Sequence, residues 1–161
     1  MLHVIVACLV LVTAAADTAV EFTLEDQRGA EISSQQLRGK PYVLIIADRD
    51  GAEHSVRWGE GLYRALGNDA VILGCAALEG VPWFLRWFVR SRFRESVTAV
   101  PVLLDWEGVL FRAYRCSPKL PTLIAVDANA RVVCRHSGKP DSDAVRNVVA
   151  LLRQRFGVEQ Q

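Results

Sequence analysis

Two unbroken apolar runs constrain this chain more than any other feature of its sequence. The stretches "YVLIIA" (42–47) and "AVILGCAA" (70–77) are rich in β-branched residues and have no polar alternation. Such runs are typical of strands that are covered on both faces. Between them the sequence predicts a helix over residues 55–66, ended by Gly67. Strand, helix and strand in this order predict a right-handed βαβ unit with a parallel sheet.

The rest of the chain supplies further elements for the same sheet. From turn residues and apolar periodicity we expect extended pieces at 22–24 and 31–33, a strand at 100–105, a short helix at 109–115, a hairpin of 122–127 with 131–137, and a last helix capped by Asp141 or Ser142. No repeat, low-complexity tract or linker interrupts these elements. We therefore predict an α/β fold in one domain.

The first sixteen residues are apolar and contain no Asp, Glu, Lys or Arg. Residues 14–16, all alanine, have the small-x-small pattern that a signal peptidase cleaves. We expect residues 1–16 to be a signal peptide and residues 17–161 to form one secreted or periplasmic domain. Two alternatives stay open. A membrane anchor needs about 17–25 apolar residues, which exceeds this run, and the segment could also be a buried N-terminal piece of the fold.

The order of these elements resembles the thioredoxin fold, and in particular the redoxins of the alkyl hydroperoxide reductase and thiol-specific antioxidant group. Three stretches carry the resemblance: "FTLEDQRGAEISSQQLRGKPYVLIIADRD" (22–50), "VPVLLDWEGVLFRAY" (100–114) and "LPTLIAVDANARVVCRHSG" (120–138). The resemblance implies a central mixed sheet flanked by helices, with an N-terminal hairpin and an inserted helix. It also implies thiol oxidoreductase or peroxidase chemistry.

The nucleophile of that family is a cysteine at the exit of the first central strand, and this chain has none there. The position holds "AEHS" (52–55), and no cysteine lies between Cys8 and Cys75. A thiolate is the nucleophile in both the peroxidase and the dithiol mechanism. His54 and Ser55 are sequence neighbours, which do not face one another on a helix. We interpret Ser55 as a helix cap and His54 as a solvated turn residue.

Three cysteines remain once the leader is removed, and Cys75, Cys116 and Cys134 are the candidate redox thiols. Cys116 lies near Arg115 and Lys119 in the sequence, and nearby cations lower the pKa of a thiol. A disulfide from Cys75 to Cys116 would close a loop of about 40 residues and stabilise the fold by about 4 kcal/mol. Cys134 is the alternative partner of Cys116. A buried apolar role is the other interpretation of Cys75.

Leu120, Pro121 and Thr122 match the cis-proline position of the family. The resemblance places this position opposite the missing cysteine and implies that it presents backbone to extended substrates. An X-Pro bond adopts the cis form at low cost, so we expect a cis bond before Pro121. The alternative is that Pro121 only shapes the start of an edge strand. Together with His54 and Ser55, Pro121 and Thr122 form the predicted binding edge.

The segment "VPWFLRWFVRSRFRES" (81–96) combines aromatic and basic residues. At helical spacing Arg86, Arg90 and Arg94 form one stripe, and Trp87 lies in a broad apolar arc. One interpretation is an inserted helix that packs its aromatic residues on the sheet and keeps the arginines solvated. The other is a helix that contacts a partner protein or an anionic membrane surface.

The remaining observations narrow the function. A net charge of +1 gives no sign of a nucleic-acid partner. The His and Cys residues lack the spacing of a zinc or copper site, so we predict no metal and no cofactor. We expect a redox-inactive binding or scaffold protein with a degenerate active site, which takes a protein or an extended peptide at the Pro121 edge. The alternative is an atypical thiol oxidoreductase or peroxidase that uses Cys116 with Cys75 or Cys134.

Overall fold

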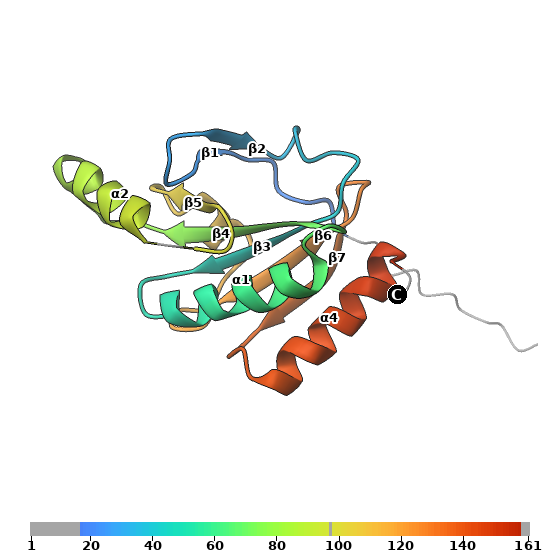
Figure 1. The fold of residues 1–161 in the computed structure, drawn as a ribbon. Helices are drawn as coiled ribbons and strands as arrows, with labels where there is room; N and C mark the ends of the chain where they lie inside the picture. The colour runs from blue at the N-terminus through green and yellow to red at the C-terminus, as the bar shows by residue number, and fades with distance from the viewer. Residues whose placement is uncertain (1–16, 97, 159–161) are drawn as a thin grey trace, which may run out of the picture.

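The computed structural model describes residues 17–96 and 98–158. Its centre is a mixed sheet with the strand order β5-β4-β3-β6-β7, and a second, two-stranded sheet is formed by β1 and β2 (Figure 1). In chain order the elements are β1 (Thr23–Glu25), β2 (Glu31–Ser33), β3 (Tyr42–Ala47), α1 (Ala52–Leu66), β4 (Val71–Ala77), the 3-10 helix η1 (Trp83–Leu85), α2 (Arg86–Glu95), β5 (Val102–Asp105), α3 (Val109–Ala113), β6 (Thr122–Val126), β7 (Val132–Ser137) and α4 (Ser142–Phe156).

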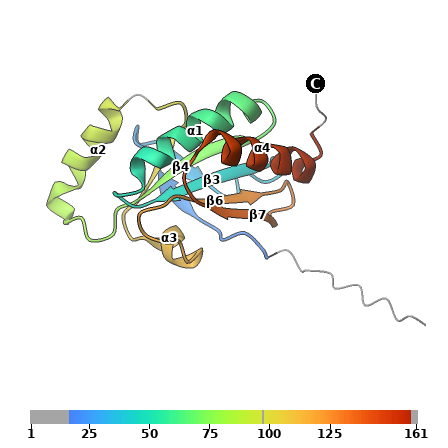
Figure 2. The same cartoon turned by 90° about the horizontal axis from the view of Figure 1, so that it is seen from below.

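The two apolar runs form the middle of the sheet, as the sequence predicts. Strand β3 pairs in parallel with β4 and antiparallel with β6, and all of its residues are buried. Helices α1 and α4 cover one face of the sheet and α3 lies on the other (Figure 2). The β1-β2 hairpin packs on the same hydrophobic core as α3. Both faces of β3 are therefore removed from water, which explains why its sequence has no polar alternation.

Side chains of β3 alternate between two separate hydrophobic cores. Leu44 and Ile46 belong to the core under the hairpin. Val43 and Ile45 belong to the core under α1 and α4, where Trp58 is 0% exposed. Because successive residues of a strand point to opposite faces, the sheet separates the two cores. This separation decides which cysteines can meet.

The ends of the two long helices differ in how well the sequence predicts them. Helix α4 begins after Asp141, whose carboxylate accepts the N–H of Ala144 at 2.8 Å, so the predicted cap is confirmed. Helix α1 begins three residues earlier than predicted, after Gly51. Ser55 lies inside the first turn and donates its N–H to the carbonyl of Gly51. The interpretation of Ser55 as the helix cap is therefore wrong.

The inserted helix α2 forms where the sequence predicts it, but it does not pack on the sheet. It projects from the body beyond strand β5 (Figure 1). The predicted burial of the aromatic residues in this segment is wrong, since Trp83 in η1 is 81% exposed and Trp87 in α2 is 72% exposed. None of the helices in residues 17–96 and 98–158 combines the length and the apolar character that crossing a bilayer requires. The predicted signal peptide lies outside the described residues.

Candidate functional site

Asp48 organises the edge of the sheet where β3 ends and α1 begins. Its carboxylate accepts the N–H of Gly51 at 2.9 Å and the N–H of Lys119 at 3.0 Å. Gly51 also packs on the loop between α3 and β6 (residues 114–121), which we call the proline loop. A Cβ added to Gly51 would lie 3.4 Å from the backbone carbonyl carbon of Leu120. One carboxylate therefore holds the start of α1 and the proline loop together. This edge is the place where the redoxin resemblance puts a reactive cysteine.

The proline loop reverses direction without a cis peptide bond. The bond before Pro121 is trans, so the predicted cis bond is wrong. The chain turns at Lys119 instead, which has φ 72° and donates its N–H to Asp48. The carbonyl of Pro121 accepts the N–H of Gly138 and the hydroxyl of Ser137, both at 3.2 Å. These bonds fix the end of the loop to strand β7.

Leu120 differs from its neighbours in the loop. Within the described residues, no hydrogen bond uses its amide N–H or its carbonyl. The residue as a whole is half-buried. Backbone groups that are left unpaired in this way can pair with an added extended chain in the manner of a strand.

The structure divides the predicted binding edge into two pairs. His54 and Ser55 are half-buried on the first turns of α1 and reach the surface. Pro121 is buried and Thr122 is 0% exposed, so their side chains cannot contact a ligand on this surface. The sequence does not single out Leu120, because its apolar side chain carries no chemical signal.

Trp58 and His136 pack together beneath this edge. The indole Nε1 of Trp58 donates to the carbonyl of Gly138 at 2.9 Å, and the ring of His136 meets the indole edge-on at 5.4 Å. His54 lies one helical turn before Trp58. Nδ1 of His54 and Nε2 of His136 are enclosed and have no hydrogen-bond partner among the described residues. Both histidines belong to the packing of the edge.

Cys75 and Cys116 lie in the same hydrophobic core. Burial raises the pKa of Cys75 strongly, and the negative charge of Asp105 raises it further. Burial also raises the pKa of Cys116, although a hydrogen bond with Thr122 and the positive charge of Arg135 lower it in part. The expectation that cations depress the pKa of Cys116 is therefore wrong, because desolvation outweighs them.

Arg135 is the cation beside Cys116. Its guanidinium donates to the carbonyls of Tyr114 and Arg115, so the end of α3 is tied to strand β7. The two sequence neighbours that were expected to act, Arg115 and Lys119, are both exposed. Arg115 is adjacent to Cys116 in sequence, but it adopts a left-handed backbone with φ 47°.

Cys134 is separated from the other two thiols. It packs on the core under α1 and α4, on the face of the sheet opposite Cys116. Burial raises its pKa as well, with a smaller opposing effect from Arg155. The suggestion that Cys134 pairs with Cys116 is wrong, because the sheet lies between them. In the structure Cys75, Cys116 and Cys134 are all free thiols.

We expect Cys75 and Cys116 to be alkylated at pH 8 at least about tenfold more slowly than free cysteine, since a raised pKa lowers the thiolate fraction tenfold per unit and burial slows access. A raised pKa leaves the thiol protonated to higher pH, so the rate should rise only above the ordinary thiol range. Iodoacetamide labelling from pH 6 to 10 with peptide mapping measures each site. A Cys116 as reactive as free cysteine at pH 7 would favour the thiol-enzyme alternative.

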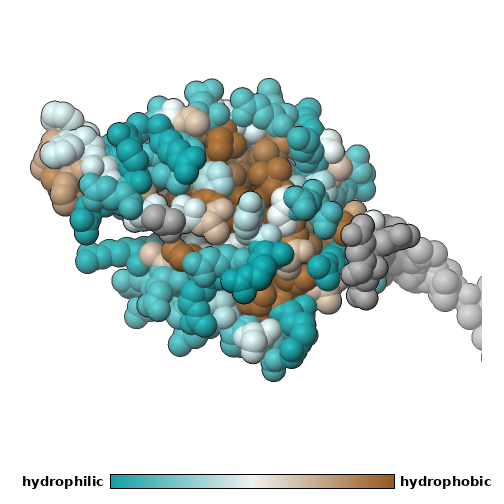
Figure 3. Space-filling model, viewed as in Figure 1, coloured by the Kyte–Doolittle hydropathy of each residue, from teal (hydrophilic) through white to brown (hydrophobic). Residues whose placement is uncertain are grey.

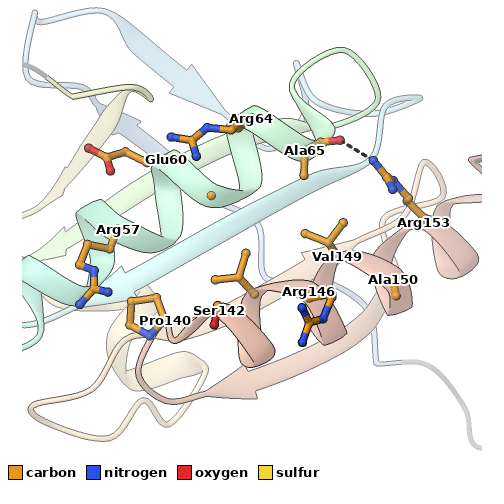
Figure 4. Close-up of a pocket in the computed structure, with 12 residues that line it drawn as sticks. Arg57, Glu60, Arg64, Ala65, Pro140, Ser142, Arg146, Val149, Ala150 and Arg153 are labelled. Carbon is orange, nitrogen blue, oxygen red and sulfur yellow. Dashed lines mark hydrogen bonds between the residues drawn. The ribbon is translucent and has the colours of Figure 1, made fainter. Parts of the chain in front are cut away.

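A shallow groove of about 620 Å³ runs between α1 and α4, away from the proline loop. Figure 4 shows Arg57, Glu60 and Arg64 on its α1 side and Arg146 and Arg153 on its α4 side. Arg153 donates to the carbonyl of Ala65 at 3.1 Å, which ties the two helices together. The other charged residues are exposed, so the groove has a solvated basic rim. In the part of the chain that the structure describes, no three His, Cys, Asp or Glu residues are placed to hold a metal ion.

Comparison with solved structures identifies the fold. The exposed lipoprotein thioredoxin of Streptococcus pneumoniae superposes with a TM-score of 0.65 at 20% identity, over 81% of this chain and 98% of its own. A putative thiol:disulfide interchange protein DsbE from Chlorobium tepidum has a TM-score of 0.65 at 16% identity, covering 85% and 96% of the two chains. Peroxiredoxin Q of Xanthomonas campestris has a TM-score of 0.63 at 15% identity, covering 86% and 99%.

These structural neighbours are thioredoxin-like redoxins, and the chain has the thioredoxin fold. At this level of identity the likeness concerns the fold alone. No family model matches the sequence. No curated protein matches it either.

Proposed function

We propose that this chain is an exported thioredoxin-fold protein that binds an extended polypeptide at the edge between α1 and Leu120 and does no thiol chemistry. The observation that carries the proposal is the unpaired backbone of the half-buried Leu120, next to Lys119, whose N–H the carboxylate of Asp48 accepts. Export is supported by the apolar leader and by a structural neighbour that is named an exposed lipoprotein.

The Leu120 edge is suited to an extended chain rather than to a small ligand. Backbone pairing gives affinity for any extended polypeptide, while the surrounding side chains give preference. Arg49, Glu53 and Lys119 are exposed around the edge and are of both signs. No concave pocket is needed for this mode of recognition. A ligand with alternating charges would match such a rim better than a purely acidic or a purely basic one.

Thiol chemistry at this edge lacks a reactive group. A redox enzyme needs an accessible thiol of low pKa, and Cys75, Cys116 and Cys134 all have raised pKa values through burial. Cys75 and Cys116 lie together, but under the hairpin rather than at the surface. The proposal therefore assigns them to the core.

The backbone of Leu120 can be tested directly with peptides selected on the wild-type protein from a random display library. Replacing the amide N–H of Leu120 with an ester oxygen by semisynthesis should weaken a selected peptide by about tenfold, because one backbone hydrogen bond is lost. Calorimetric titration measures the affinity. The matched control is Leu120→Ala, which keeps the amide and should bind within a few-fold of wild type.

A variant without the three thiols separates binding from redox chemistry. Cys75→Ala, Cys116→Ala and Cys134→Ala in one chain should leave peptide affinity unchanged, and neither this chain nor wild type should reduce insulin disulfides. Unchanged affinity in the Leu120 ester would remove the proposed site. Loss of binding in the thiol-free chain, with its fold verified by circular dichroism, would favour the thiol-enzyme alternative.

A further inference from the structure

Helix α2 and the preceding η1 expose an unusual amount of apolar surface. We call Trp83, Phe84, Trp87 and Phe88 the aromatic patch; they are 81%, 56%, 72% and 50% exposed. All four lie within six consecutive residues on the part of the chain that projects from the body, where Figure 3 shows pale and light-brown side chains on the left. Isolated exposed apolar residues need no explanation, but a contiguous patch marks a contact surface.

The charged side of α2 is turned towards the body of the protein. Arg86 donates to Glu107 at 2.8 Å and lies over the ring of Trp106. One turn later Arg90 pairs with Glu25 on β1. An ordinary surface helix turns its apolar side inwards and its charges outwards. Here the arginines attach the helix and leave the aromatic patch facing the solvent.

Charge is distributed unevenly along the chain. Residues 83–96 hold four of its 19 lysines and arginines but one of its 18 acids, so the remainder is net acidic. Arg92 and Arg94 lie at the exposed C-terminal end of α2, beyond the patch. Tryptophan and phenylalanine flanked by arginine are the composition of helices that lie in the interface of an anionic bilayer. The basic segment is complementary in charge to such a surface.

The size and shape of the patch favour a lipid surface over a second copy of the chain. Its four rings expose on the order of 500 Å², if an aromatic side chain offers 150–250 Å². A stable protein interface needs about 800 Å² on each side. Helix α2, which carries Trp87 and Phe88 of the patch, also projects from the body (Figure 1). A projecting surface inserts into lipid without the complementary groove that a protein partner must supply.

We propose that η1 and α2 bind the surface of a phospholipid bilayer with anionic headgroups. The aromatic patch enters the boundary between headgroups and acyl chains, and Arg92 and Arg94 contact lipid phosphates. Arg86 and Arg90 keep the helix attached to Glu107 and Glu25, so that the patch faces the membrane. This contact is independent of the polypeptide edge at Leu120.

The test uses the full chain with vesicles of phosphatidylcholine alone or mixed with phosphatidylglycerol. Brominated acyl chains in the mixed vesicles should quench the fluorescence of Trp83 and Trp87 in wild type. The double variant Trp83→Phe/Trp87→Phe should lose this quenching, because it lacks the two tryptophans that enter the bilayer. The double variant Trp83→Ser/Trp87→Ser should bind vesicles about a hundredfold more weakly than wild type in flotation, which is about tenfold for each tryptophan removed. Tyr63→Ser, which truncates a 53% exposed ring on α1, is the matched control and should partition like wild type.

Three outcomes would overturn this proposal. Vesicles that float the protein without quenching Trp83 and Trp87 would show that another segment binds lipid. A concentration-dependent dimer in sedimentation velocity that the serine variant loses would assign the patch to a second copy. Absence of flotation, quenching and dimerisation would leave an apolar protein partner as the occupant. Stronger binding to anionic than to neutral vesicles, weakened by salt, is the expected result.

Discussion

Replacing Trp58 with alanine is expected to lower the free energy of unfolding by about 3–5 kcal/mol, the range observed when a buried tryptophan or phenylalanine is truncated. Trp58 is 0% exposed at the centre of the core under α1 and α4. Its truncation would leave a cavity between the helix and the sheet. It would also leave the carbonyl of Gly138 without the indole N–H that it accepts at 2.9 Å. Urea denaturation followed by circular dichroism measures the loss.

The matched control for this variant is Trp58→Phe. Phenylalanine keeps most of the apolar volume but cannot donate to Gly138. It should therefore lose about 1–2 kcal/mol, from a partial cavity and one hydrogen bond. An alanine variant that lost less than the phenylalanine variant would show that Trp58 does not hold α1 on the sheet.

Replacing Asp105 with alanine is expected to destabilise the protein by about 2–3 kcal/mol, because charge-assisted hydrogen bonds at a helix start are lost. Asp105 is 0% exposed, and its two carboxylate oxygens accept the N–H groups of Val109 and Leu110, each at 2.9 Å. Both amides belong to the first turn of α3, where the helix itself supplies no acceptor. Without the carboxylate these amides have no other acceptor in the described structure.

The control for Asp105 is asparagine, which keeps the size and one acceptor oxygen. Asp105→Asn should lower the free energy of unfolding by about half as much as Asp105→Ala does, as measured by chemical denaturation. It also removes the charge that raises the pKa of Cys75, so alkylation of Cys75 should start at a lower pH than in wild type. An alanine variant as stable as wild type would show that burying the carboxylate costs as much as its hydrogen bonds contribute.

Much of the fold could be predicted because its signals are local. The apolar runs of β3 and β4 and the Asp141 cap of α4 are each readable within a few residues. The start of α1 could not be read in this way. It depends on Asp48, whose carboxylate also bonds to Lys119, a residue that is 71 positions away. Ser55 carries a cap signal, but the helix begins after Gly51, whose N–H the carboxylate of Asp48 accepts.

The candidate site was less predictable because its determinants are tertiary. The orientation of α2 is set by Glu25 and Glu107, and neither lies near the helix in sequence. The pKa of Cys116 is set by burial and by Arg135, rather than by the adjacent cations. Leu120 is a candidate binding residue because its backbone groups are unpaired, and a pattern of side chains does not predict which backbone groups are unpaired.

The parallel pairing of β3 with β4 also has a spatial consequence for the two proposed contacts. Ala47 and Ala76 lie side by side, so both strands end at one end of the sheet, where β6 begins next to Ile46. From that end the chain continues from β3 into α1 and from β4 into η1 and α2. Helix α2 is about 15 Å long at 1.5 Å per residue. If both proposed contacts form, the bound polypeptide and the bilayer meet the protein at segments that leave the same end of the sheet, an arrangement that suits a ligand tethered to the same membrane.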